Sequence, residues 1–350
     1  MNQKHLIILV CSLLFSTGVS AQIGGDNTYE FLNLSSAARI GAMGGKLVPV
    51  ADNDVNLVWT NPALLSDSMS RHLSFSGVNY FADIKYGYAA YAHHYEGVGN
   101  FSAAIHYVDY GTFDETDVTG QVLGSFGAQE YSLNLTYSRP LLDSSLSVGG
   151  TLKTIYSSLE DYNSFGMAAD IGAHYLLKNN VTNLSLVFRN IGTQITTYRP
   201  DNREPLPFEI QLGISHRLPK APFRFSLVLH HLEKFDLTYE DPAKKDQVDP
   251  ITGEPLQEKI TFGDKVLRHV IFGTELLISK SFHIRASYNF QRRNELGVST
   301  KLSTVGLSWG FGFRISKFHL SYGRAAYHLA GASNHFSITT NLGDFMKRVN

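Results

Sequence analysis

The chain has almost no cysteine: among its 350 residues the one thiol is Cys11. Cys11 lies in an apolar run, 6–15, that follows Lys4 and precedes the small residues Val19-Ser20-Ala21. This order is typical of a secretory signal peptide, so we expect export and cleavage after Ala21. The mature chain would then lack cysteine, which excludes disulfides, zinc–thiolate sites and thiol catalysis.

An excess of charge of one sign is also missing, as are long apolar runs. Loss of residues 1–21 would remove Lys4 and no acid from 30 basic and 31 acidic residues, leaving 29 against 31. This balance gives no reason to expect nucleic acid as a partner. After residue 21 no apolar run approaches the roughly 18–20 residues of a membrane-spanning helix. If the protein lies in a membrane, it must therefore form a closed barrel, because only helices and closed barrels pair every backbone group in hydrocarbon.

What the chain does have is strict alternation of apolar and polar residues in short segments, from about residue 72 to residue 342. A period of two places the apolar side chains on one face of each strand. About fourteen such segments are present, and bacterial single-chain barrels have an even number of strands. They begin near His72, Tyr86, Val98, Phe126, Ser144, Tyr162, Asn180, Pro205, Ala221, Val266, Phe282, Lys301, Phe318 and Ala332.

The connections between these segments alternate in length. Long polar connections are expected at 111–125, 192–204, 235–265 and 292–300. Tight connections are expected on the opposite side, at 96–97, 140–143, 178–180, 219–220, 279–281 and 316–317. Two connections on the side of the long loops, 81–85 and 158–161, are short exceptions. If the first strand starts on the periplasmic side, every long loop lies on the exterior side. Short periplasmic turns and long outer loops are typical of an outer-membrane barrel. A secreted β-sandwich is the alternative, but it needs only about 7 to 9 strands.

The cost of charge in lipid predicts which face of the barrel points outward. A Lys or Arg facing mid-bilayer lipid costs about 2–4 kcal/mol. The apolar stripes should therefore face lipid, and the charged side chains should face the lumen. The predicted lumen residues are Asp170, Arg189, Glu209, Gln211, Arg224, His230, Arg285, Asn289, Arg314 and His319.

Residues 22–71 do not alternate. Ser35 or Ser36 could cap a short helix, 37–43, that stops at Gly44-Gly45, and Asn61 is a good capping residue before Pro62. We expect this segment to form a hatch inside the lumen, with a periplasmic tail as the alternative. The predicted organisation is a signal peptide at 1–21, a hatch at 22–71 and an antiparallel transmembrane β-barrel at 72–350.

Several motifs near the N-terminus resemble those of the PorQ family of the type IX secretion system. The most specific are the run Gly24-Gly25-Asp26-Asn27-Thr28-Tyr29 and the stretch Asn79-Tyr80-Phe81-Ala82-Asp83. Two others are similar to the wider group of FadL-like barrels, which includes the PorV shuttle. The hatch motif that follows from this resemblance comprises Ala38, Arg39, Met43, Gly44, Gly45, Asn61, Pro62 and Ala63.

The resemblance implies a fourteen-stranded barrel with a hatch in the cell outer membrane. It further implies a non-enzymatic role in an attachment complex, in which the barrel anchors a PorZ-type surface protein beside the PorU sortase and the PorV shuttle. Anionic lipopolysaccharide would be the acceptor for cargo, and no cofactor or catalytic residue is implied. One alternative is a FadL-like transporter of hydrophobic molecules. Another is a PorV-like shuttle that receives cargo.

Catalytic and metal-binding patterns are mostly absent. Adjacent histidines on a strand point to opposite faces, so we expect neither His93-His94 nor His230-His231 to chelate a metal. Asp52-Asn53-Asp54 lacks the further ligands of a calcium loop. No Gly-x-Ser-x-Gly elbow is followed by a helix, so the sequence predicts no metal site and no enzyme.

One connection stands out as a candidate docking surface. The stretch 236–264 is far longer than a hairpin needs, carries charges of both signs and is stiffened by prolines. Long surface loops tend to be functional, so we expect this loop to bind a partner on the exterior side. A solvated loop without a partner is the alternative. The candidate docking residues are Lys244, Lys245, Asp246, Asp249 and Glu254.

Overall fold

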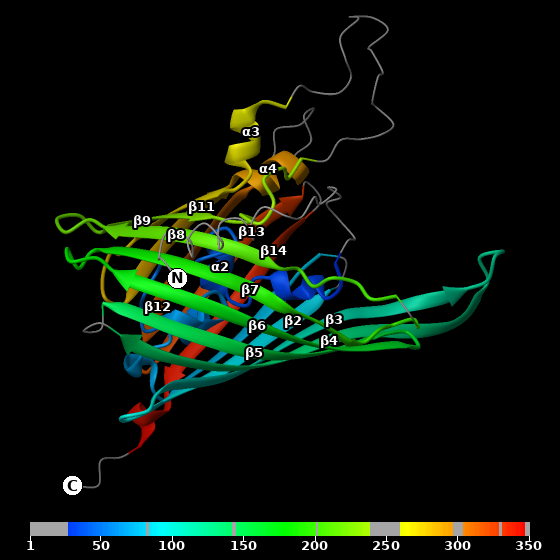
Figure 1. Cartoon of the computed structure of the whole chain (residues 1–350), viewed down its shortest axis with the longest axis horizontal. Helices are drawn as coiled ribbons and strands as arrows, with labels where there is room; N and C mark the ends of the chain where they lie inside the picture. Colours follow the sequence, from blue (N-terminus) through cyan, green and yellow to red (C-terminus); the bar gives the residue numbers. More distant parts are fainter. Residues whose placement is uncertain are drawn as a thin grey trace, which may run out of the picture.

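Antiparallel strands account for more than half of the residues described in the computed structural model, which are 27–81, 84–141, 145–200, 202–238, 260–296, 304–328 and 331–346. Within these residues fourteen strands form one closed barrel in which each strand pairs with its neighbours in sequence (Figure 1). The predicted fold class and strand number are confirmed. The strands are β1 (His72–Asn79), β2 (Lys85–Tyr95), β3 (Gly99–Thr116), β4 (Val122–Leu141), β5 (Leu146–Leu159), β6 (Tyr162–Leu176), β7 (Thr182–Thr196), β8 (Glu209–Arg217), β9 (Phe223–Leu229), β10 (Val270–Leu276), β11 (Phe282–Asn289), β12 (Leu307–Ile315), β13 (Phe318–His328) and β14 (Gly331–Asn341).

Closure of the barrel joins the first strand to the last. β1 and β14 pair antiparallel from His72 opposite Asn341 to Asn79 opposite Asn334. The sheet therefore has no free edge strand, which meets the requirement that backbone N–H and C=O groups in hydrocarbon be paired.

The outward face carries the apolar residues that the alternation predicts. On β4 and β6, Leu133 is 47% exposed, Leu135 52% and Ile171 55%. A soluble protein rarely leaves so broad an apolar surface in water, so this belt contacts lipid. The polar residues between these positions point into the barrel. The predicted lumen residues Asp170, Arg189, Glu209, Gln211, Arg224, His230, Arg285 and Asn289 are all buried.

The predicted long loop at 111–125 is wrong over most of its length. β3 continues to Thr116 and β4 begins at Val122, and this hairpin extends well beyond its neighbours (Figure 1). Asp117 tightens the turn, because its side chain accepts hydrogen bonds from the backbone N–H groups of Thr119 and Gln121. The residues here are polar, but pairing between two strands needs only backbone groups, so low hydrophobicity concealed the strand.

Two short helices lie where the sequence predicts strand or loop. Phe290 was expected to continue a strand but begins α4 (Phe290–Leu296), where Asn289 accepts the backbone N–H of Arg292 at 3.0 Å. α3 (Phe262–Leu267) begins with a capping box between Thr261 and Asp264. None of the helices in the described part of the chain has the length and apolar character needed to cross a membrane.

The N-terminal segment lies inside the barrel, drawn in blue within the ring of strands (Figure 1). Its elements are η1 (Glu30–Asn33), α2 (Ala38–Ala42), η2 (Val55–Trp59), η3 (Pro62–Leu64) and η4 (Asp67–Met69), and the chain ends in η6 (Leu342–Phe345). Trp59 packs against Tyr88 and His106 of the wall, with ring centroids 5.6 and 4.8 Å apart. The predicted signal peptide, 1–21, lies outside the described residues.

Bare glycine backbone in the wall lets this segment approach closely. Gly149 of β5 faces η3, and a Cβ at Gly149 would lie 2.5 Å from the carbonyl oxygen of Pro62. Gly150, the next residue, faces the opposite side, where a Cβ would meet only the backbone oxygen of Asp170 at 3.6 Å. The inner face therefore has no room for a side chain at this point.

We predict that Gly149→Ala lowers stability by about 1–3 kcal/mol, the usual cost of overpacking, because η3 and β5 must move apart. Gly150→Ala is the matched control and should change stability little. The measurement is the temperature at which the folded barrel loses its faster gel mobility. Equal midpoints for the two variants would contradict the close contact.

Candidate functional site

The candidate site is the contact between the N-terminal segment and the inner wall, where the hatch motif lies. α2 ends at Ala42, and the predicted stop at Gly44-Gly45 is confirmed as the turn that follows: Gly44 has φ +86°, and the N–H of Gly45 donates to the carbonyl of Ile40 at 2.9 Å. The predicted serine cap is wrong. The N-cap position is Ala37 and no side chain caps the helix there.

The wall supplies the missing partner at the start of α2. The backbone N–H of Ala38 donates to the hydroxyl of Ser337 on β14 at 2.9 Å. At the other end, the Gly44 carbonyl accepts from the side chains of Asn289 and Arg292, each at 3.2 Å. The wall thus satisfies backbone groups at both ends of this short helix.

Arg39 connects α2 to three strands through a buried ion-pair network. Its guanidinium contacts Glu275 of β10 at 3.0 Å and also Asp52 and Asp54 of its own segment. Glu275 is completely buried and also binds Arg224 of β9 and Arg285 of β11, with Nε–O distances of 2.7 and 3.0 Å.

The network balances its charges and crosses between the two parts of the molecule. It contains three arginines and three carboxylates, and Arg224 also binds both oxygens of Asp52 at 3.0 and 2.8 Å. Forked contacts of this kind fix the relative orientation of the groups. Arg39 and Asp52 of the segment therefore depend on Glu275 and Arg224 of the wall, and the reverse.

Asn61, Pro62 and Ala63 form a second attachment. The Asn61 carboxamide accepts the backbone N–H of Ala63 at 2.9 Å and donates to the carbonyl of Val48 at 3.1 Å. Pro62 occupies the first position of η3, so the predicted cap is confirmed. The carbonyl of Leu65, just after η3, accepts from two wall residues, Asn100 and Ser138.

The apolar residues of the segment are packed against one another and the wall. Phe31, Leu32, Ile40 and Met43 are each no more than 2% exposed, and Phe31 stacks on His106 at 5.7 Å. Leu34 is partly buried against the same cluster. Apolar residues at these positions could line the pocket of a transporter or pack the segment, and in this structure they pack it.

A polar cavity of about 760 Å³ lies between this network and the periplasmic end of the barrel. The network forms its inner end, and basic residues at the ends of strands surround its mouth. Arg314 and His319, the two remaining predicted lumen residues, line this cavity. The other basic residues at the mouth are Arg217, Lys280 and Lys317.

On the exterior side, the described ends of the long connection are held together. Lys265 of α3 forms an ion pair with Asp236, and hydrogen bonds from Lys265 and Thr238 lower the pKa of Asp236 to about 2. Apolar side chains remain exposed beside this pair, with Phe235 57% and Phe262 72% exposed. The predicted docking residues Lys244, Lys245, Asp246, Asp249 and Glu254 lie outside the described residues.

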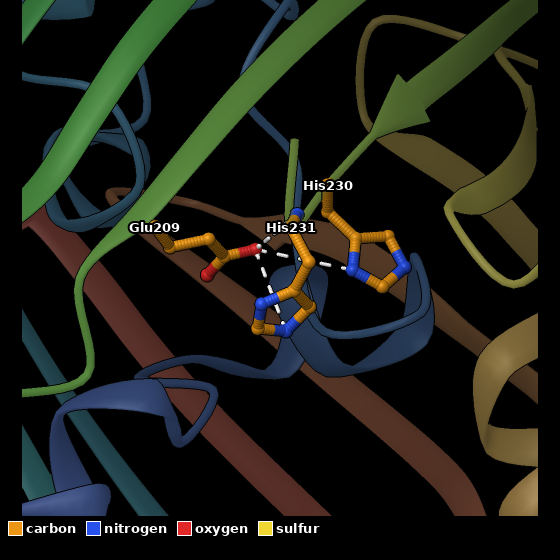
Figure 2. A group of neighbouring side chains, drawn as sticks. All are labelled: Glu209, His230 and His231. Atoms are coloured by element: carbon orange, nitrogen blue, oxygen red, sulfur yellow. Dashed lines mark hydrogen bonds and ion pairs between the residues drawn. The ribbon is translucent and has the colours of Figure 1, made fainter. Parts of the chain in front are cut away.

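The two histidine pairs differ. His93 packs against the outward-facing Tyr91 and Tyr95, whereas His94 bonds to Asn100, so this pair is separated as expected. For His230-His231 the premise of opposite faces is wrong. His231 has φ +53°, which breaks the alternation after β9 and brings both rings beside Glu209 (Figure 2).

We predict that Arg39→Met destabilises the barrel by about 3–5 kcal/mol, because it leaves buried carboxylates without their full set of partners. Arg314→Met, at the exposed mouth of the same cavity, should cost little. Thermal unfolding in detergent measures both changes.

The double variant Arg39→Met/Glu275→Gln removes one charge of each sign and should be less destabilised than the sum of the two single variants. Strict additivity would show that Arg39 and Glu275 do not act as one network.

No family model matches the sequence, and no curated protein matches it. Two of the solved structures that are similar to it are of TodX. The toluene transporter TodX of Pseudomonas putida has a TM-score of 0.52 and 12% identity, over 87% of this chain and 96% of that one. A TodX monoaromatic hydrocarbon channel carrying the deltaS2 mutation has a TM-score of 0.52 and 13% identity, over 88% and 97%. At this identity the likeness shows the fold alone: a closed antiparallel β-barrel.

Proposed function

We propose that the chain is a non-enzymatic outer-membrane anchor in the attachment complex of a type IX secretion system. In this proposal the barrel holds a PorZ-type surface protein beside the PorU sortase and the PorV shuttle, with anionic lipopolysaccharide as the acceptor of cargo. The proposal rests on the motif resemblance of the N-terminal segment. One structural observation carries it further: the segment is bound into the lumen by the Arg39–Glu275 network.

A segment held in this way favours a static role for the barrel. To clear the lumen, Arg39, Asp52 and Asp54 would have to leave Arg224, Glu275 and Arg285 together, and the charges left behind would stay buried. Uncompensated buried charge is expensive. The parts of the molecule that remain available for a partner are then the exterior loops.

The exterior loops offer a suitable surface. Phe235 and Phe262 lie with their ring centroids 5.8 Å apart, and Val266 and Leu267 of α3 are 40% and 42% exposed. We name these four residues the α3 patch. Clustered aromatic and aliphatic side chains are the usual anchors of a protein interface, and in the sequence Phe235 and Phe262 stand on either side of the long connection.

Transport of hydrophobic molecules is the second candidate, because TodX, which has the same fold, is described as a toluene transporter. The packing of Phe31, Leu32, Ile40 and Met43 weighs against it, since a ligand would have to displace them. A PorV-like shuttle is distinguished from an anchor by what it retains, cargo instead of a PorZ-type protein.

We predict that the double variant Phe235→Asp/Phe262→Asp reduces the PorZ-type protein retained on cells about tenfold or more, since loss of interface anchors costs about 2 kcal/mol or more. Met346→Asp, an exposed apolar position after β14 at the periplasmic end, is the matched control and should retain the partner. Retention is measured by immunoblotting of whole cells after normalising to the folded barrel.

A second variant tests the candidate docking residues by deleting 244–255. If both exterior variants keep the surface protein at the normal level, the anchoring role is rejected. Should the purified barrel instead carry a stoichiometric hydrophobic molecule, detected by mass spectrometry after isolation in native lipid without detergent, the transporter is the better description.

A further inference from the structure

A cluster at the exterior end of the lumen is arranged as a metal site. Glu209, the first residue of β8, faces His230 and His231, which directly follow β9 (Figure 2). The Glu209 carboxylate oxygen Oε1 lies 3.9 Å from His230 Nδ1 and 3.8 Å from His231 Nε2. The three candidate ligand atoms all lie within 4.8 Å of one another.

Two of these side chains are buried with unused polar atoms. His230 and Glu209 are both 0% exposed. Neither ring nitrogen of His230, nor Glu209 Oε2, has a hydrogen-bond partner among the residues that the structure describes. Buried polar atoms almost always have a partner, so an imidazole with two unused nitrogens beside a carboxylate indicates a ligand that completes the site.

His231 is held in the form that a metal requires. Its Nδ1 lies 3.0 Å from Glu233 Oε1. Because a carboxylate only accepts, Nδ1 carries the proton, and the lone pair of Nε2 faces the Lys46 ammonium beside Glu209. Glu233 is itself fixed by the backbone N–H of Ile210 at 2.9 Å. A carboxylate that orients the second nitrogen of a histidine is the common outer shell of metal-bound imidazole.

Lys46 shows that the position attracts a cation. Its ammonium pairs with Glu209 and lies 3.3 Å from His231 Nε2. The simplest interpretation is that Lys46 neutralises Glu209. That interpretation leaves His230 unexplained, because an ammonium paired with Glu209 and His231 does not satisfy the His230 nitrogens. Lys46 has a flexible stem and can withdraw when a divalent ion competes for the same two groups.

We propose that Glu209, His230 and His231 bind a divalent transition metal of the zinc class, with Lys46 as the competing cation. Two imidazoles and one carboxylate suit zinc and its neighbours better than calcium or magnesium, which prefer oxygen ligands. A tetrahedral ion with bonds of about 2.0–2.1 Å holds its ligand atoms about 3.4 Å apart. Each histidine nitrogen then needs to approach Glu209 Oε1 by about 0.5 Å, and the two nitrogens need to approach each other by at most about 1.4 Å, which side-chain rotation can supply. The fourth position is left for water or a group from a partner.

The site joins parts of the wall that the sheet does not. Strand pairing between β8 and β9 ends, toward the exterior, with Leu212 opposite Leu229. Beyond it, the N–H of Leu232 donates to the carbonyl of Ile210 at 3.1 Å. A bound ion would cross-link Glu209 to the start of the long exterior connection. This cross-link requires no partner protein, so the inference does not depend on the proposed function.

The test uses the full-length barrel without a histidine tag, stripped with a chelator and titrated with zinc chloride, and with cobalt chloride for its visible absorption. We expect one equivalent to bind. Affinity should fall at least tenfold in Glu209→Gln and in His231→Ala. It should rise about tenfold in Lys46→Met, because the competing positive charge is gone. His93→Ala, outside the cluster, is the control and should bind as the unmodified chain does.

Gel mobility before and after heating shows whether each variant is folded. X-ray absorption of the zinc-loaded unmodified chain gives an answer that needs no variant, and two imidazoles per zinc are expected. Absence of binding in Lys46→Met overturns the proposal. So does binding that persists in the folded Glu209→Gln and His231→Ala variants, or a zinc spectrum without imidazole ligands.

Discussion

The structure depends on one constraint: backbone N–H and C=O groups in hydrocarbon must be paired within the protein. Fourteen strands satisfy it only by closing, which β1 and β14 do along their full overlap. Closure in turn divides the side chains by parity, one set toward lipid and the other toward the lumen. The lumen then collects the polar residues of all fourteen strands, and these need partners that lipid cannot supply.

The N-terminal segment supplies many of those partners. Its helix ends use Ser337, Asn289 and Arg292, and its charges complete the network around Glu275. The segment also depends on the wall, because α2 has only five residues and a helix of that length is not stable alone. Wall and segment therefore stabilise each other, which explains why the glycines of the inner face lie where backbone comes closest.

The sequence was a good guide wherever structure follows from local periodicity. The outward belt and the buried Arg189, Arg224 and Arg285 follow from period two and the cost of charge in lipid. It was a poor guide where partners come from elsewhere in the chain: Ser337, 299 positions from Ala38, could not be chosen over Ser35 or Ser36 as the group that meets α2. The same limit applies to Glu275, whose neighbours Arg39, Arg224 and Arg285 are brought together only by closure. Adjacent residues of a strand face opposite sides, but this rule does not hold for His230-His231, because His231 has a positive φ and lies after the end of β9.

The lumen also bears on the difference between an anchor and a transporter of the same fold. A channel needs a segment that moves at low cost, and an apolar contact can slide because dispersion is not directional. A balanced network of forked ion pairs cannot slide in this way, because each arginine must move together with the carboxylates that it pairs with. The inner end of the segment, around Arg39 and Asp52, is therefore fixed more firmly than its apolar cluster around Phe31 and Trp59. Any path for a hydrophobic molecule would have to open on the exterior side of the network, in the cluster that Phe31 and His106 now fill.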